Sequence, residues 1–128
     1  PHYRAGRIWA YYTNAGVING TVTYTGSDHP IIEIGAHLVL NGPPETVDYQ
    51  FSGAPYSLRG LQDGSYYIYA VIDYDGSGGP PDPTDPVAFY DPDHDGSPNA
   101  VVISSGNRIY DIDFEINGIV LFLPILLK

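Results

Sequence analysis

Alternation of apolar and polar side chains with a period of two is the feature that most constrains how this chain can fold. Val17–Tyr24 shows it clearly, and Tyr66–Asp73 is the most strand-like run in the chain. Successive side chains of a β-strand point to opposite faces, so each segment is predicted to be a strand with one buried face. The predicted buried faces are Ile18, Gly20, Val22 and Tyr24 in the first segment, and Tyr66, Ile68, Ala70 and Ile72 in the second.

Composition also favours strands joined by turns. No window of about eleven residues or more repeats apolar residues at the helical period of 3.6. The chain holds 15 Gly, 12 Pro and 12 Tyr but no Met, a balance typical of β structure. The other expected strands are Ile8–Tyr12, Ile31–Leu40 with a bulge at Gly35, Thr46–Phe51, Tyr56–Leu61, Ala100–Ser104, and Arg108–Ile116 with the dry face Tyr110, Ile112, Phe114 and Ile116.

Length and charge narrow the class of protein. With 128 residues and a formal net charge of −10, we expect one domain that binds neither nucleic acid nor anionic membrane surfaces. The absence of cysteine excludes disulfides, thiol catalysis and thiolate zinc sites. A start at Pro1, without an initiator Met or signal peptide, suggests a processed chain. Asn19 begins an N-glycosylation sequon, which matters in a secreted protein.

Carboxylates are concentrated between Asp73 and Gly96. Seven of the 15 acidic residues lie in this stretch, and no Lys or Arg accompanies them. Their mutual repulsion would oppose folding unless a cation neutralises it. Asp91, Asp93 and Asp95 precede Gly96 with the spacing of the first half of a calcium loop, which has oxygens at positions one, three and five and glycine at six. The sequence therefore predicts a Ca²⁺ site.

A second, weaker calcium loop is expected to use Asp73, Asp75 and Ser77. Neither loop is an EF-hand, because Thr84 and Val102 stand where the carboxylate of position twelve belongs. Asp82 and Asp85 would supply the missing oxygens if the two acidic segments fold against each other. The alternative is a solvated acidic loop, stiffened by proline, that keeps the protein soluble.

Part of the chain resembles a known family. The segments that carry the resemblance are INGTVTY at 18–24, YSLRGL at 56–61, GSYYIYAVID at 64–73 and DPTDP at 82–86. Their order resembles the carboxypeptidase-regulatory-like, or transthyretin-like, β-sandwich domains of secreted bacterial proteins. The resemblance covers residues 17–116, leaves 1–16 as an N-terminal arm, and implies an all-β, Ig-like antiparallel sandwich of about seven or eight strands. Hydroxyisourate hydrolases share that fold, but their C-terminal Tyr-Arg-Gly-Ser tetrapeptide and paired histidines have no counterpart here.

The C-terminal segment 117–128 extends beyond this resemblance. Nine consecutive apolar residues follow Asn117-Gly118. A helix of that length would span about 14 Å of a bilayer core of about 30 Å, whereas a strand would reach about 30 Å. The segment could fold back into its own domain, enter a groove of the next molecule, or be the stub of a membrane anchor. The expected polymerisation strand is Ile119, Val120, Leu121, Phe122, Leu123, Ile125 and Leu126, interrupted by Pro124.

These features lead to two hypotheses of function. The first is a structural subunit of an extracellular filament, in which identical subunits donate an apolar terminal strand head to tail and calcium stiffens the acidic loops. The second is a monomeric, calcium-dependent carbohydrate-binding or adhesive accessory domain that stacks glycans on Trp9 and tyrosines. An enzyme is not expected, because no serine lies in a G-x-S-x-G context and the four histidines are scattered.

Overall fold

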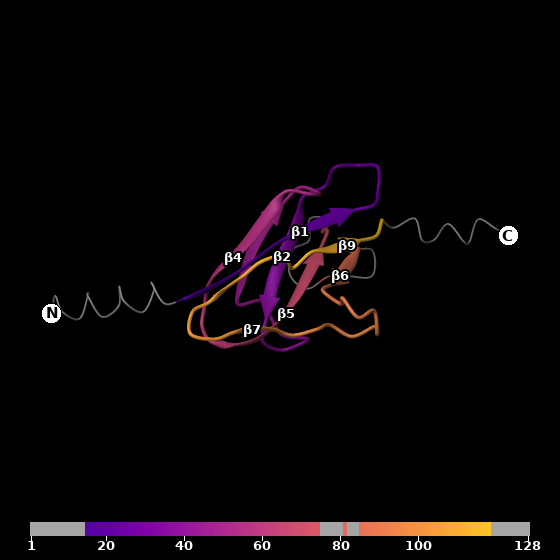
Figure 1. Cartoon of the computed structure of the whole chain (residues 1–128). Coiled ribbons are helices and arrows are strands. Elements are labelled where there is room, and N and C mark those ends of the chain that lie inside the picture. Colours follow the sequence, from indigo (N-terminus) through magenta and orange to yellow (C-terminus); the bar gives the residue numbers. More distant parts are fainter. Residues whose placement is uncertain (1–14, 75–80, 82–84, 119–128) are drawn as a thin grey trace.

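The computed structural model describes residues 15–74, 81 and 85–118 (Figure 1). The expected strand Ile8–Tyr12 and the apolar segment 119–128 lie outside these residues. The described part is all-β, with nine strands in two sheets that pack as a sandwich. The predicted fold class is therefore confirmed.

Both sheets are built around a central strand. Strand order is β4-β1-β8 in the first sheet, with β9 farther along β1, and β3-β2-β5-β6 in the second, with β7 farther along β5. Neighbours are antiparallel except β8 and β9, which run parallel to β1. The strands are β1 Gly16–Tyr24, β2 Ile32–His37, β3 Thr46–Gln50, β4 Pro55–Leu61, β5 Gly64–Val71, β6 Val87–Phe89, β7 Val101–Ile103, β8 Arg108–Ile109 and β9 Phe114–Ile116.

The core lies between the two sheets and uses the predicted faces of β1 and β5. Each fully buried aliphatic side chain contributes about 1.5–3 kcal/mol relative to exposure in water. The sheets are also joined at one side, where the Asp48 carboxylate of β3 accepts a hydrogen bond from the Ser57 N–H of β4 at 2.9 Å. Buried core residues include Ile18, Val22, Tyr24, Tyr66, Ile68, Ala70 and Ile72.

Two features of β2 differ from expectation. Gly35 is not a bulge, because it pairs in regular register with Val47 and Tyr69. A Cβ at Gly35 would lie 3.0 Å from Pro44, so the glycine leaves room for the β2–β3 connection. The strand ends at His37, and the expected remainder, 38–40, forms an exposed turn.

The expected last strand is broken in the middle. Asp111 has a positive φ of 63°, which separates β8 from β9 and shifts the alternation by one residue. Tyr110 is consequently 60% exposed rather than buried, while Ile112 stays in the core. The segment between β8 and β9 can lie this close to β1 because β1 has glycine at position 20, where a Cβ would overlap the Ile112 carbonyl.

The two ends of the sandwich carry different segments. At the entry end, where β1 begins, Gly16 lies against Ile103. At the exit end, where β1 and β9 finish, the Gly118 N–H donates to the Thr25 hydroxyl at 3.0 Å. The described residues therefore begin and stop at opposite ends of the domain (Figure 1).

Candidate functional site

Three predicted ligands come together in the loop between β6 and β7. Asp91, Asp93 and Asp95 each offer one carboxylate oxygen, and these oxygens lie within 4.8 Å of one another. All three side chains are accessible to solvent. Such spacing suits several oxygens sharing one hard cation, whose distance to each ligand is about 2.3–2.6 Å for Ca²⁺.

Backbone N–H groups shape this acidic loop around Asp91. Its carboxylate accepts hydrogen bonds from the Gly96 N–H at 2.9 Å and the Asp95 N–H at 3.3 Å. Gly96 has a φ of 87°, a conformation that glycine adopts without strain. The base of the loop is closed by Tyr90, whose carbonyl accepts from the Asn99 N–H at 2.9 Å.

Asn99 is a site residue that the sequence reasoning missed. Its Nδ2 donates to the Asp93 carboxylate at 3.2 Å, and its buried Oδ1 has no hydrogen-bond donor. Counting from Asp91 as position one would have found it, because Asn99 occupies position nine, which often contributes a ligand in calcium loops. Position nine lies beyond the half-loop spacing on which the prediction depended.

Electrostatics differ between the carboxyl groups of this cluster. Desolvation raises the pKa of Asp91, and the neighbouring Asp93 and Asp95 add to the rise against the opposing Gly96 N–H. The hydrogen bond from Asn99 lowers the pKa of Asp93, with a further contribution from Asp91. The cluster thus contains one carboxyl that takes up a proton readily and one that stays ionised.

Asp73 and Asp85, the other predicted ligands that the structure describes, are not part of this cluster. Asp85 is buried, with 8% of its surface exposed, and it precedes β6, whereas Asp91 follows that strand. The Ile72 N–H donates to the Pro86 carbonyl, so the β5–β6 register, continued by two pairs, sets Asp73 opposite Asp85. Asp85 therefore lies beside Asp73 rather than in the Asp91 cluster, and its role as a ligand stays a prediction. The predicted ligands outside the described residues are Asp75, Ser77 and Asp82.

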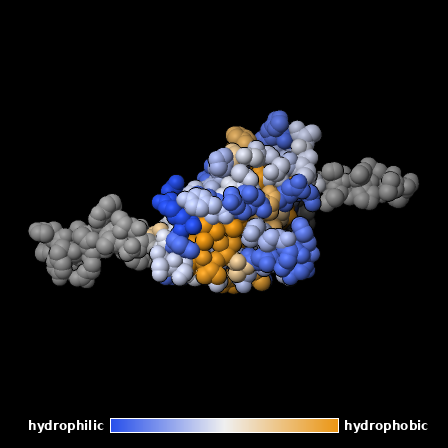
Figure 2. Space-filling model, in the orientation of Figure 1, coloured by the Kyte–Doolittle hydropathy of each residue, from blue (hydrophilic) through white to orange (hydrophobic). Residues whose placement is uncertain are grey.

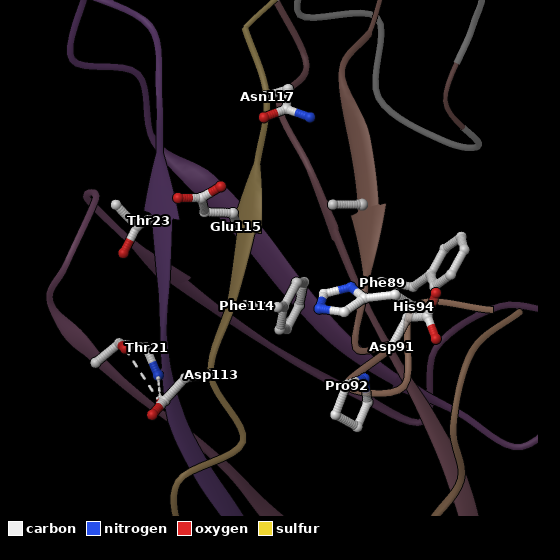
Figure 3. Close-up of a pocket in the computed structure, with 11 residues that line it drawn as sticks. Thr21, Thr23, Phe89, Asp91, Pro92, His94, Asp113, Phe114, Glu115 and Asn117 are labelled. Carbon is white, nitrogen blue, oxygen red and sulfur yellow. Dashed lines mark hydrogen bonds between the residues drawn. The ribbon is translucent and has the colours of Figure 1, made fainter. Parts of the chain in front are cut away.

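A groove of about 690 Å³ runs along the side of the acidic loop. One wall comes from β6 and the loop, with Phe89, Asp91 and His94, and the other from the segment around β9 (Figure 3). Figure 3 shows the rings of His94 and Phe114 directed into the space between these walls. The remaining lining residues are Thr21, Thr23, Ala88, Pro92, Asp113, Glu115 and Asn117.

Asn19, the predicted glycosylation site, is held within the first sheet. Its Nδ2 donates to the Ile109 carbonyl at 3.2 Å, and its Oδ1 accepts from the Ser57 hydroxyl at 3.0 Å. A glycan on Nδ2 would have to displace the 109 segment from β1. The folded geometry therefore disfavours glycosylation of Asn19, which stays a prediction.

Aromatic rings on the outer face of the second sheet pack against one another. The Tyr69 ring makes edge contacts with His37 at 5.1 Å and Phe89 at 5.7 Å between centroids. All three side chains are half-buried. They form no flat row of exposed rings of the kind that stacks against sugars, and Trp9 lies outside the described residues.

No protein-family model matches the chain, and no curated protein or solved structure shows significant similarity to it. The transthyretin-like resemblance therefore stays a prediction. Among the residues that the structure describes, no helix is long and apolar enough to span a membrane.

Proposed function

We propose that this chain is a structural subunit of an extracellular filament, in which copies associate head to tail and a Ca²⁺ ion stiffens the Asp91–Gly96 loop. The observation that carries the proposal is an exposed apolar patch at the entry end, opposite the end where the apolar C-terminal segment begins. The role is structural rather than catalytic.

The apolar end patch consists of four side chains that are 44–63% exposed. Leu38 lies 3.4 Å from the position of a Cβ on Gly64, and Val102 pairs with the adjacent Ser65. The patch thus surrounds the start of β5, and Figure 2 shows apolar surface on this side of the molecule. Its members are Leu38, Val39, Leu40 and Val102.

The segment 119–128 of a second copy is the occupant proposed for this patch. Gly118, the last described residue, lies at the exit end beside Gly26 and Tyr24. Nine apolar residues follow it, and leaving them in water would favour aggregation. Contact between the exit end of one copy and the entry end of the next does not close on itself, so it generates a filament.

Sedimentation velocity of the intact chain across a micromolar concentration series tests this assembly. We expect large, concentration-dependent species in the wild type and their loss in Val39→Asp or Leu123→Asp. Tyr49→Asp is the matched control, because Tyr49 is equally exposed but belongs to β3, away from the patch. A wild type that stays monomeric at every concentration would contradict the filament.

The acidic cluster supports calcium rather than a softer metal. Its three converging ligands are all carboxylates, and the Asn99 Nδ2 holds one of them, Asp93, by a hydrogen bond. Hard oxygen ligands in a flexible loop suit Ca²⁺, whereas Mg²⁺ demands near-ideal octahedral geometry. Incomplete loops of extracellular modules bind with dissociation constants of about 10⁻⁴–10⁻³ M.

Calorimetric titration of chelator-treated protein with Ca²⁺ tests the loop separately from assembly. At about 10 mM Ca²⁺, ligand binding in that affinity range would stabilise the fold by about 1.4–2.7 kcal/mol. Asp93→Asn is expected to abolish the gain. Asp111→Asn is the control, because Asn tolerates the positive φ of that exposed site outside the loop. Absence of both heat and stabilisation in the wild type would remove calcium from the proposal.

A further inference from the structure

We infer that the groove between β6 and β9 is a docking site for the N-terminal segment 1–14 of a second copy of this chain. This inference rests on the proposed self-assembly and adds to it a second, charge-based contact. It also names which segment and which surface make that contact.

The groove is acidic and partly aromatic. Three of its lining residues carry carboxylates, and no Lys or Arg is among the described residues that line it. The Phe114 ring supplies apolar surface between these charges, whereas the Phe89 ring packs against Tyr69 on the other side of β6. A ligand that fits both properties is an extended segment that combines cationic and aromatic side chains. The three acidic residues are Asp91, Asp113 and Glu115.

Segment 1–14 has this composition. It contains two of the five Lys and Arg residues of the chain, the single Trp, three Tyr, and no Asp or Glu. In a protein whose formal net charge is −10, this segment carries a charge opposite to that of the groove. The groove wall at 113–117 is long enough for about five extended residues, or about 16 Å. The best-matched stretch is Arg7–Tyr11.

Chain direction makes docking between copies consistent with the proposed head-to-tail assembly. β1 runs from the entry end toward the groove, which contains Thr21 and Thr23 of that strand. Ala15, the first described residue, therefore lies about 20 Å from the groove. Docking between copies brings the exit end of one against the entry end of the next. This is the same end-to-end contact in which segment 119–128 is proposed to bury the apolar end patch.

Trp9 provides a direct readout of docking, because it is the only tryptophan in the chain. We expect its fluorescence emission to shift to shorter wavelengths as the protein concentration of the intact chain rises. Reversing the arm charges with Arg4→Glu and Arg7→Glu should weaken this transition at least about tenfold, and so should Glu115→Lys in the groove. Glu115 is exposed on the β9 wall. Combining Glu115→Lys with the single arm substitution Arg7→Glu should restore part of the affinity, because it re-creates an opposite-charge pair in the reversed order.

Controls distinguish this inference from the filament proposal. Glu45→Lys repeats the charge change of the groove variant on an exposed residue beside β3. Arg59→Glu repeats the charge change of the arm variants on β4. Neither should move the Trp9 transition. An emission spectrum that is independent of concentration, or equal effects of Glu115→Lys and Glu45→Lys, would overturn arm docking. If assembly then still depends on Val39 and Leu123, only this inference fails. A wild type that never assembles removes both proposals.

Discussion

The hydroxyl of Tyr56 donates a hydrogen bond of 2.6 Å to the carbonyl oxygen of Ile112, inside the core. This contact ties β4 to the irregular segment between β8 and β9. Burial raises the pKa of the Tyr56 hydroxyl above its ordinary range, so it remains a donor at every physiological pH. One buried side chain thus satisfies a carbonyl group at the point where the last strand is broken.

Tyr56→Phe is expected to lower the free energy of unfolding by about 1–3 kcal/mol, because it leaves the buried Ile112 carbonyl without a donor. Chemical denaturation measures the change. Tyr110→Phe is the matched control, since that ring is 60% exposed, and its effect should stay within about 0.5 kcal/mol. Equal effects of the two substitutions would mean that the hydrogen bond contributes nothing to stability.

Gly20→Ala is expected to destabilise the fold more than an ordinary Gly→Ala change in a strand. A Cβ at this position would overlap the Ile112 carbonyl oxygen, so the 110–113 segment would have to move away from β1. Gly64→Ala is the control, because the nearest atom to its Cβ would be in the Leu38 side chain at 3.4 Å, an ordinary van der Waals contact. Thermal unfolding of both variants compares them, and a Gly20→Ala protein as stable as Gly64→Ala would refute the close approach.

Asp63 is expected to stabilise the β7–β8 turn. Its carboxylate accepts hydrogen bonds from the Ser105 N–H at 3.0 Å and the Gly106 N–H at 3.2 Å. Asp63→Ala should cost about 0.5–1.5 kcal/mol and speed hydrogen exchange at these two amides. Asp63→Asn keeps one acceptor and should have a smaller effect. Unchanged exchange in Asp63→Ala would contradict the capping role.

Calcium affinity is expected to fall with acidification before ordinary aspartates titrate. The raised pKa of Asp91 means that its proton binds first as the pH drops, and the protonated carboxyl no longer serves as a ligand. Without calcium, protonation of Asp91 stabilises the folded state, because a carboxyl whose pKa is raised by folding holds its proton more tightly in the folded protein. Asp93, whose pKa is lowered, stays ionised and favours folding until the pH falls through its own lower pKa.

Titrations of calcium binding at a series of pH values between about 7 and 3 test this order. His94→Gln separates the contribution of the neighbouring imidazole, and we expect it to leave the profile unchanged. A loss of affinity that His94→Gln abolishes would assign the pH dependence to histidine instead. An affinity that is constant over the whole range would exclude the aspartate cluster as the ligand.

Local pattern was enough to predict most of the strands and both central faces. Ile18 and Ile68 are buried because alternation is a property of the strand itself, whatever its neighbours. β6 was missed, since three apolar residues within an acidic stretch carry no periodic signal and pair only because β5 offers an edge. Tyr110 was wrongly predicted to be buried. The positive φ of Asp111 shifts the alternation by one residue, and nothing in the hydrophobic pattern indicates this shift.

The sequence by itself determined the all-β class, the buried faces of β1 and β5, and the spacing that brings Asp91, Asp93 and Asp95 together, because each depends on residues close along the chain. Only the tertiary structure decided that β8 and β9 run parallel to β1, that Asp85 lies apart from the Asp91 loop, and that a groove forms between β6 and β9. These features join residues far apart in sequence, and their geometry depends on how the sheets pack rather than on any local preference.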